Sequence, residues 1–573
     1  MNLTRFLPFL RWFPMTGGTI KADFMAGITV ALVLIPQSMA YAQLAGLPAY
    51  YGLYAAFLPV AIAAMWGSSH QLGTGPVAVV SLLTASSLAV FAAPGSADFV
   101  ALAIMLALLV GVIQLLLGVF KLGVIVNFLS HPVIVGFTNA AAIIIGLSQV
   151  SKLFGVPMGR SEHFINDIVG VVKLIGDTHV PTLAMGIAAI ALMWAIRKFK
   201  PQLPGVLIAV VLTTSLSWAL DFERSLGGQV VGAIPEGLPS LAVPTLDLTR
   251  LQALLSAALV ISLVGFMEAI SIAKAIAAKT KQRLDPNQEL IGQGLANIVG
   301  SFTQAFPASG SFSRSAVNMG AGAKTGLSSV ITTLFVLLTL LFLTPLLYHL
   351  PQAVLAAIII MAVIGLVNFE AVKHAWHANK HDGIAAVVTF IATLAFAPHL
   401  DEGIMVGAGL ALILFLMRTM KPRVAQLGRF KDGTLRDIKV NPGIPTSEHV
   451  VAMRFDGQLY FANVSYFEDT VLGALADHPK ASFFLVVGDG INQLDASGEE
   501  VIHHLVTRLK DAGVTLVFSG LKKQVLDVMR ATGLFEAITQ ANIFATEDQA
   551  LAAIYERLGD DAKDDLFCMV QPA

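Results

Sequence analysis

Long apolar stretches, separated by short polar loops, occupy the chain from about residue 22 to 425. No charged residue occurs between Asp23 and Asp98, and the stretch 99–120 alone can cross a bilayer core, which takes about 20 residues. The pattern predicts about fourteen membrane segments, at 22–44, 50–66, 74–91, 99–120, 124–149, 181–196, 203–220, 251–273, 287–304, 311–323, 326–348, 351–369, 383–399 and 402–417. Proline and glycine predict interrupted helices in the first segment (LIPQS), the third (GTGPVAVVSLL) and the tenth (SFSRSAVNMG).

The pattern changes after about residue 425. HVVAMRFDGQLYFAN, ASFFLVVGDG and GVTLVFSG have the character of strands, whereas SGEEVIHHLVTRLKDA and LKKQVLDVMRAT have that of amphipathic helices. This alternation predicts a small soluble α/β domain. We therefore expect an N-terminal segment at 1–21, a membrane domain at 22–425, an α/β domain at 440–560 and a tail at 561–573.

The composition is typical of a membrane protein, with 56% hydrophobic and 13% charged residues, against about 25% charged in soluble domains. The net charge of −1 does not indicate a nucleic-acid partner. A single cysteine, Cys568, excludes a disulfide within the chain. The first 18 residues contain no apolar region followed by a cleavage site, so we expect no removable signal peptide.

Basic residues gather in alternate loops, as in RKFK at 197–200, the loop around 274–283, and Arg418 to Arg423. Short cytoplasmic loops collect lysine and arginine. With an even number of spans, both termini are expected in the cytoplasm. We expect a multi-pass protein surrounded by membrane lipid.

Two pairs of unusual residues are separated by similar numbers of positions, which indicates an internal repeat. Pro76 lies 237 positions before Ser313, and Gln37 lies 231 positions before Glu268. Two halves of seven segments each would be inverted relative to one another, because seven is odd, and such repeats with broken helices are typical of secondary transporters. The alternative is a chance coincidence of offsets.

The third and tenth segments are the candidate binding elements. Half-helices that begin near Pro76 and near Phe312 would each leave unpaired backbone N–H groups and a positive dipole end inside the membrane. Helix starts of this kind bind anions, and the hydroxyls of Ser311 and Ser313 could add donors. Gly75 and Gly310 would allow close backbone approach.

Arg314 in the tenth segment is a fixed positive charge in a segment that is predicted to lie within the lipid bilayer. A guanidinium at that depth costs at least about 2.5 kcal/mol, so it normally faces a cavity and has a partner. A transported anion is one candidate partner. The alternatives are a permanent pair with a carboxylate and a side chain that reaches the membrane interface.

Three further polar residues are candidates. Burial favours the neutral form of a carboxyl, so Glu268 in the eighth segment is a candidate proton carrier, with a static salt bridge to Arg314 or Lys274 as the alternative. Gln37 and Tyr41 are four residues apart and can share a helix face. They could line the cavity or merely bond to neighbouring helices.

Histidines give no indication of a cofactor or metal. His131 precedes a proline and fits a helix start, and His374, His377 and His381 fit a solvated basic loop better than a metal site. Neither a nucleophile–base pair nor a set of metal ligands occurs in the membrane segments, so we do not expect an enzyme.

Four long motifs carry a family resemblance: AGITVALVLIPQSMAYAQLAGLPAYYGLY (26–54), GTGPVAVVSLL (73–83), NQELIGQGLANIVGSF (287–302) and GSFSRSAVNMGAGAKT (310–325). The chain resembles the SulP sulfate permease family, whose relatives include the pendrin and prestin anion transporters. Its C-terminal region, with DGINQLDASGEE (489–500), resembles a STAS domain.

The resemblance implies a polytopic α-helical membrane protein with a seven-plus-seven inverted repeat, divided into core and gate domains, and a cytoplasmic STAS domain. It also implies a homodimer in a bacterial inner (plasma) membrane. Glu268 would match the proton-coupling acid. The anion would be held by Gln37, Tyr41, Val77, Ala78, Ser311, Phe312, Ser313 and Arg314.

Ser497 aligns with the serine that is phosphorylated in related anti-sigma-factor antagonists. A serine at a helix start can equally be a simple N-cap. The STAS domain is also expected to support dimerisation or to bind a cytoplasmic protein.

The sequence favours a secondary active anion transporter, with proton-coupled sulfate uptake by an elevator movement of the core against the gate. A dicarboxylate (C4) or bicarbonate carrier of the same family is the alternative. An anion channel, or an anion sensor that signals through the STAS domain, is the alternative of another class. A titrating group such as Glu268 distinguishes coupled transport from both of these.

Overall fold

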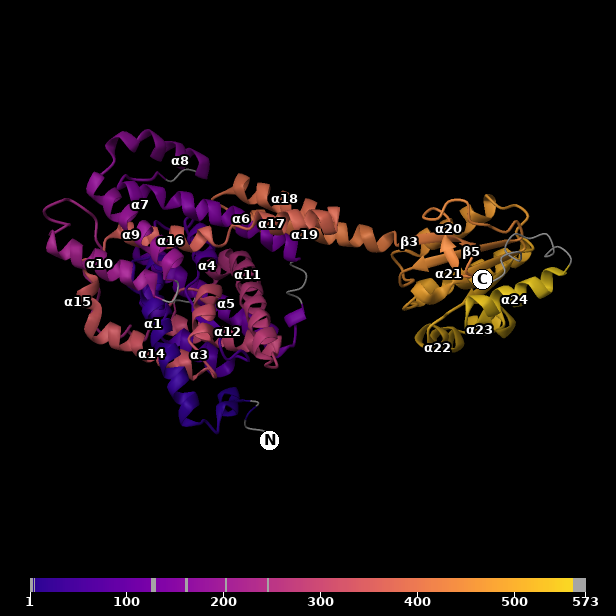
Figure 1. The fold of residues 1–573 in the computed structure, drawn as a ribbon, viewed down its shortest axis with the longest axis horizontal. Helices are drawn as coiled ribbons and strands as arrows, with labels where there is room; N and C mark the ends of the chain where they lie inside the picture. Colours follow the sequence, from indigo (N-terminus) through magenta and orange to yellow (C-terminus); the bar gives the residue numbers. More distant parts are fainter. Residues whose placement is uncertain are drawn as a thin grey trace. The chain divides into compact units, whose positions relative to one another are not determined.

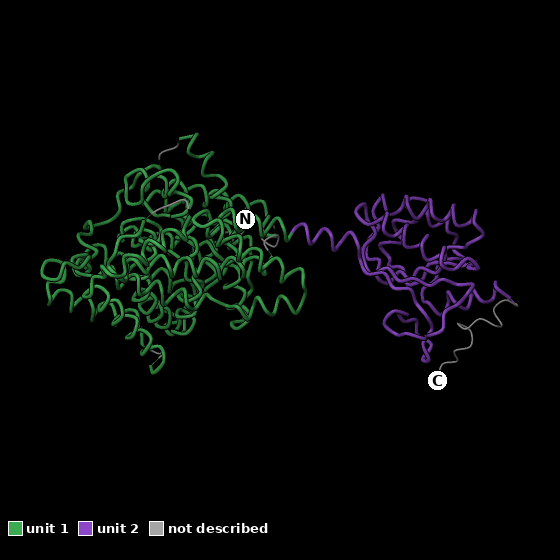
Figure 2. The backbone as a smooth tube through the Cα atoms, turned by 90° about the horizontal axis from the view of Figure 1, so that it is seen from above, with its two compact units in different colours: residues 1–411 green, residues 412–573 purple. Residues whose placement is uncertain are grey.

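The computed structural model describes Thr4 and residues 6–124, 130–159, 163–200, 203–244 and 247–559. The chain divides into two compact units, residues 1–411 and 412–573 (Figures 1 and 2). The tail expected at 561–573, with Cys568, lies outside the described residues.

The first unit is helical, and each of the fourteen predicted segments contains a helix. Eight helical stretches in the described part of the chain are long and apolar enough to cross a membrane by themselves. The helices in these segments are α1 (Gly17–Leu44), α2 (Tyr50–Ala55) with α3 (Leu58–Trp66), α4 (Ala78–Leu88), α5 (Ala97–Val119), α6 (His131–Ser148), α9 (Val180–Phe199), α10 (Gly205–Ala219), α11 (Leu248–Thr280), α12 (Pro286–Phe302), α13 (Phe312–Gly320), α14 (Leu327–Leu338), α16 (Gln352–Ile364), α18 (Lys380–Phe396) and α19 (Leu400–Met420).

Shorter elements lie between these helices. A π-helical turn (Thr339–Leu343) and α15 (Thr344–Leu347) extend α14. The other connecting elements are a 3-10 helix at Pro8–Trp12, α7 (Val150–Phe154), α8 (Phe164–Lys173), a 3-10 turn at Ile175–Asp177 and α17 (Phe369–Ala378).

The expected interruption of the first segment is wrong. α1 runs without a break from Gly17 to Leu44 with Pro36 inside it. Proline removes one backbone donor, and a membrane helix tolerates this where packed neighbours and side-chain hydroxyls compensate. Here Pro36 is buried, and α1 packs against α2, α13, α14 and α16.

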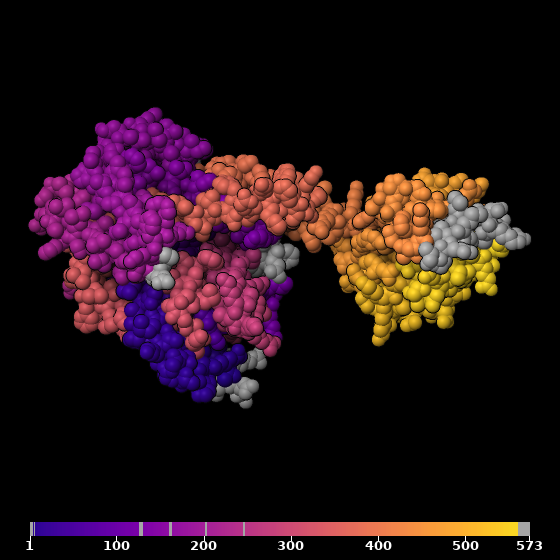
Figure 3. Space-filling model, in the orientation of Figure 1, coloured from indigo at the N-terminus to yellow at the C-terminus, as the bar shows by residue number. Residues whose placement is uncertain are grey.

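The helices of the first unit form two packed groups. In one, α12 lies against α3 and α5, α11 against α5, and α1 against α14. In the other, α18 lies against α6 and α17, and α16 against α6 and α9. The second group occupies the upper part of the unit in Figure 1, and α8, α9 and α10 form one continuous purple to magenta region of the surface in Figure 3. These groups correspond to the expected core and gate domains.

The second unit contains a six-stranded sheet in the order β4-β3-β5-β6-β7-β8, with β3 antiparallel to β4 and β5 and the remaining pairs parallel. The strands are β3 (Arg423–Arg429), β4 (Leu435–Asp437), β5 (Val450–Asp456), β6 (Phe483–Val487), β7 (Thr515–Ser519) and β8 (Ile543–Phe544). β3 and β4 precede residue 440, so the sheet begins earlier than the boundary expected from the sequence. The helices are α20 (Val464–Ala476), α21 (Ala496–Asp511), α22 (Lys523–Thr532), α23 (Leu534–Ile538) and α24 (Glu547–Leu558), with 3-10 turns at Gly488–Gly490 and Gln540–Asn542.

Apolar side chains along the strands point alternately to the two faces of the sheet and form one apolar layer on each face. Val451, Met453 and Phe455 of β5 pack under the layer that contains α20 to α23, whereas Val450 and Ala452 face the side covered by α24. This period of two is what a strand buried on both faces requires.

Candidate anion-binding site

Two short strands bring the third and tenth segments together. β1 (Gly73–Gly75) pairs antiparallel with β2 (Ser309–Ser311), with Thr74 opposite Gly310. Each strand leads directly into a short helix, since α4 begins at Ala78 and α13 at Phe312. The two helix starts expected from the sequence are therefore present, and the strand pair holds them next to each other.

The two helices begin differently. Val77 is the N-cap of α4, and no side chain among the described residues caps that start. The first N–H groups of an α-helix have no acceptor within the helix, so those of α4 are left to other partners. Ser311 is the N-cap of α13, and its hydroxyl accepts from the backbone N–H of Arg314 at 3.5 Å. The Ser311 hydroxyl also lies 3.3 Å from that of Ser313.

Arg314 is completely buried beside β1. Its side chain is 0% exposed, and none of its three guanidinium nitrogens has a hydrogen-bond partner among the described residues. A side-chain carbon at Gly75 would lie 3.3 Å from Nη2 of Arg314, and one at Gly73 would lie 3.0 Å from its Cβ. Glycine at both positions therefore makes room for the arginine. The alternative that Arg314 reaches the membrane interface is wrong.

Glu268, on α11, and Tyr41, on α1, are the ionisable groups that interact electrostatically with Arg314. Within the described chain, however, Glu268 forms no ion pair with Arg314 or with Lys274, so the alternative of a static salt bridge is not observed. Oε2 of Glu268 is buried and has no hydrogen-bond partner in the described structure. Tyr41 of α1 and Glu268 of α11 thus interact electrostatically with Arg314 of α13, without an ion pair between Glu268 and Arg314 in the described chain.

The remaining predicted residues fall into two sets. Gln37, Tyr41, Val77 and Ala78 are all buried, and Oε1 of Gln37 lacks a hydrogen-bond partner among the described residues. Phe312 and Ser313 differ, because both are exposed, with Phe312 64% accessible. The first turn of α13 therefore presents Phe312 and Ser313 to an accessible surface and directs Arg314 into the interior.

This arrangement is suited to an anion. The start of an α-helix carries about half a positive charge, and backbone N–H groups there bind anions directly. Arg314 adds a full positive charge without a bonded counterion in the described chain. A guanidinium offers donors in a planar fork that matches the oxygens of an oxyanion.

Sequence reasoning missed the residues that support the two strands. Gln293 Nε2 donates to Thr74 Oγ1 at 2.9 Å, and Ser315 Oγ accepts from the backbone N–H of Gly73 at 2.8 Å. Gln293 lies within the motif NQELIGQGLANIVGSF, which carries the family resemblance but whose residues were assigned no role from the sequence. The spacing of its polar residues at four-residue intervals was the available signal.

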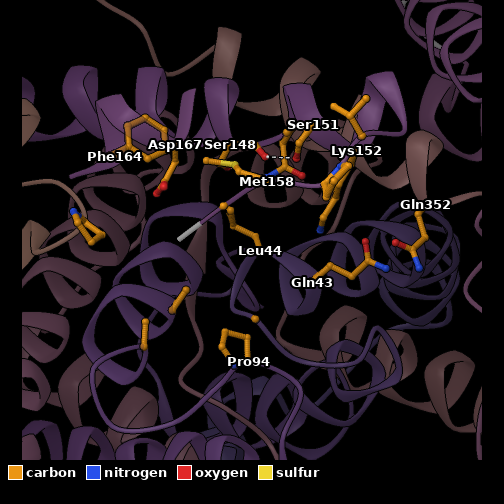
Figure 4. A pocket seen from close by; sticks show the side chains of 18 of the residues that line it. Gln43, Leu44, Pro94, Ser148, Ser151, Lys152, Met158, Phe164, Asp167 and Gln352 are labelled. Atoms are coloured by element: carbon orange, nitrogen blue, oxygen red, sulfur yellow. Dashed lines mark hydrogen bonds between the residues drawn. The ribbon is translucent and has the colours of Figure 1, made fainter. Parts of the chain in front are cut away.

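A separate cavity of about 1260 Å³ lies beyond the carboxyl end of α4. It is lined by Gln43 and Leu44 of α1, by Ser86 of α4, and by Ser148 and Gln352 of the gate. Figure 4 shows Gln43, Ser148 and Gln352 around the cavity together with Lys152 and Asp167. None of the predicted anion-binding residues lines it. It is therefore distinct from the place where Arg314 lies.

Ser497 lies in the first turn of α21, where Asp495 is the N-cap and accepts from the backbone N–H of Gly498 at 2.8 Å. The interpretation of Ser497 as an N-cap is therefore wrong. Ser497 is partly exposed. Its phosphorylation stays a prediction.

These features define a class of protein: a polytopic helical membrane transporter in which two short helices begin side by side, joined to a STAS domain. The model of the sulfate permease family matches residues 20–389, and that of the STAS domain matches residues 441–550. The chain belongs to the sulfate permease family, a family of transporters and not of enzymes.

Relatives and solved structures agree with this assignment. The chain is 37% identical to the chloroplastic sulfate transporter 4.1 of Arabidopsis thaliana over 93% of its own length and 79% of that protein. It is 32% identical to a probable sulfate transporter of Mycobacterium tuberculosis, over 94% and 96% of the two chains. The murine Slc26a9 anion transporter in the inward-facing state has the same fold, with a TM-score of 0.88, 24% identity and coverage of 97% and 95%. The transmembrane domain of the cyanobacterial bicarbonate transporter BicA matches 70% of this chain and 98% of its own, with a TM-score of 0.58 and 22% identity.

Proposed function

We propose that this protein is a secondary active anion transporter that takes up sulfate together with protons. The observation that carries the proposal is the completely buried guanidinium of Arg314, which has no hydrogen-bond partner in the described structure and lies in the first turn of α13, next to Gly75 just before α4. Sulfate transporters among the curated relatives support the same substrate.

Charge balance favours a divalent oxyanion. Two helix starts contribute about half a positive charge each, and Arg314 contributes one, so the site carries about two positive charges when Glu268 is neutral. Sulfate carries two negative charges and presents oxygens in every direction, which suits donors from several elements. An ionised Glu268 would leave only about one positive charge.

Glu268 is the group that links the anion to a proton. It interacts electrostatically with Arg314 but is not bonded to it, so its charge directly affects how strongly the site attracts an anion. Protonation of Glu268 removes a negative charge from the site before sulfate enters. Release of the proton on the other side would then weaken sulfate binding and favour its release.

Movement of the core against the gate would carry the anion across the membrane. The helices α4 and α13 and the strands β1 and β2 pack on the core helices α1, α3 and α11, so the site can move as one body with the core group. This elevator movement, a homodimer, an inner-membrane location and a protein partner of the STAS domain are parts of the proposal that follow from the family resemblance. Cytoplasmic termini are a further part, which follows from the basic residues in alternate loops.

Uptake by purified protein in proteoliposomes tests the proposal. We expect saturable uptake of labelled sulfate that increases when an inward proton gradient is applied and that does not respond to a sodium gradient. Parallel measurements with succinate and bicarbonate separate the sulfate carrier from the other carriers of this fold. Uptake that does not saturate and ignores the proton gradient would indicate a channel, and binding without uptake would indicate a sensor.

A further inference from the structure

Three buried polar side chains lie one above another on α12. Glu289, Gln293 and Asn297 are spaced four residues apart, which places them on one face of the helix. All three are at most 2% exposed. Most side-chain polar groups that are buried to this extent form hydrogen bonds, and each of these three side chains is bonded to a different segment of the core.

The first contact holds the turn before β1. Oε2 of Glu289 accepts from the backbone N–H groups of Ser68 and Ser69, at 2.8 and 3.0 Å, and from the hydroxyl of Ser68 at 3.1 Å. This turn joins α3 to β1. Glu289 therefore fixes the point from which β1 departs.

The second and third contacts hold the two strands. Gln293 donates to the hydroxyl of Thr74 in the middle of β1, at 2.9 Å. Asn297 bonds to both backbone groups of Ala308, the residue before β2: its Oδ1 accepts at 2.8 Å and its Nδ2 donates at 3.1 Å. One face of α12 thus forms hydrogen bonds with β1 and with the residue that precedes β2.

β1 lies between this helix face and the arginine. Side chains alternate along a strand, so Thr74 points away from the side that Gly73 and Gly75 present. Thr74 bonds to Gln293, whereas Gly73 and Gly75 make room for Arg314. A shift of β1 away from α12 would therefore change the space around the guanidinium.

α12 is itself a firm support, because it packs backbone against backbone on α5. A side-chain carbon at Gly294 would lie 2.5 Å from the backbone nitrogen of Leu115, and one at Gly111 would lie 2.6 Å from that of Ile298. Contacts this close allow little sliding of one helix on the other.

We propose that Gln293 and Asn297, together with Glu289, are positioning residues of the anion site. They do not touch the anion; they fix β1 and β2 so that the start of α4, the start of α13 and Arg314 face one another at the distance that the anion requires. This inference rests on the proposed function. It also assigns a role to the motif NQELIGQGLANIVGSF.

Variants of the Thr74–Gln293 bond test the inference in the full chain. Thr74→Val and Gln293→Leu each leave one buried polar group unpaired, so each should lower the melting temperature and raise KM for sulfate roughly tenfold, with kcat within about twofold of the wild type. The double variant removes both polar groups and should recover the melting temperature. Its KM should stay high, because no side-chain hydrogen bond between the described residues then joins β1 itself to α12, although Glu289 still holds the preceding turn.

Thr74→Ser keeps the hydroxyl and should restore a KM close to that of the wild type. Thr213→Val makes the same change in α10, where the hydroxyl bonds to Ala209 of its own helix, and should leave KM unchanged. If Gln293→Leu does not fold, the comparison of Thr74→Val with Thr74→Ser still reports on the bond.

A KM that returns to the wild-type value together with the melting temperature in the double variant would overturn the inference, since it would show a purely structural role. A fall in kcat at constant KM would do the same. These results are distinct from failure of the proposed function, which would appear as no saturable sulfate uptake by the wild-type protein.

Discussion

A buried guanidinium with no bonded counterion in the described chain is costly to keep in a membrane protein, and this cost points to a ligand. We expect Arg314→Ala to abolish saturable sulfate uptake and to weaken sulfate binding at least roughly 30-fold, because loss of one partner of a buried charge pair costs about 2–5 kcal/mol. Sulfate-dependent thermal shifts would measure the binding. Arg250→Ala is the matched control, because Arg250 is 46% exposed and lies 3.5 Å from Asp98. Equal sulfate affinity in the Arg314→Ala protein would remove Arg314 from the site.

A separate prediction concerns Glu268, because its proposed role is to bind the proton and not the anion. Glutamine keeps the shape of the side chain but cannot ionise, so Glu268→Gln should retain sulfate binding and lose the stimulation of uptake by an inward proton gradient. Counterflow of labelled sulfate, which needs no gradient, should persist. Glu370→Gln, at an exposed position on α17, is the control. A proton dependence that survives in Glu268→Gln would assign the coupling to another group.

At the scale of elements, the contact between α5 and α12 supports the whole site. Alanine at Gly294 would place a carbon 2.5 Å from the backbone of Leu115, so Gly294→Ala should separate the two helices and destabilise the protein by about 1–3 kcal/mol. A lower melting temperature in detergent would show this. Gly146→Ala on α6, whose nearest new contact would be at 3.8 Å, should be neutral or slightly stabilising because alanine favours a helix. Equal melting temperatures for the two variants would contradict this account of the packing.

The same elements show what a sequence can predict. Apolar length is a local property, so all fourteen membrane segments could be located, and Gly75 and Pro76 mark the start of α4 just as Ser311 marks that of α13. The pairing of β1 with β2, and the bond from Gln293 to Thr74, join residues more than 200 positions apart and leave no local pattern.

Pro36 led to a wrong prediction of an interrupted helix, because a proline can remain inside a helix that its neighbours enclose. The exposure of Phe312 beside the buried Arg314 depends on how α13 is rotated, which tertiary packing decides.

At the scale of the whole molecule, every residue assigned to the anion site lies between Gln37 and Arg314, within the first compact unit. If the second unit only regulates or assembles the transporter, the first unit should keep its sulfate affinity when the second unit is disconnected. The link can be cut at an inserted protease site between Met420, where α19 ends, and Arg423, where β3 begins, after the intact protein has been reconstituted. We expect KM for sulfate and the response to a proton gradient to be unchanged within about twofold, with any change confined to the maximal rate. The uncut protein in the same vesicles is the control. A loss of sulfate binding on cleavage would mean that the STAS domain completes the site, and would favour an anion sensor over a carrier.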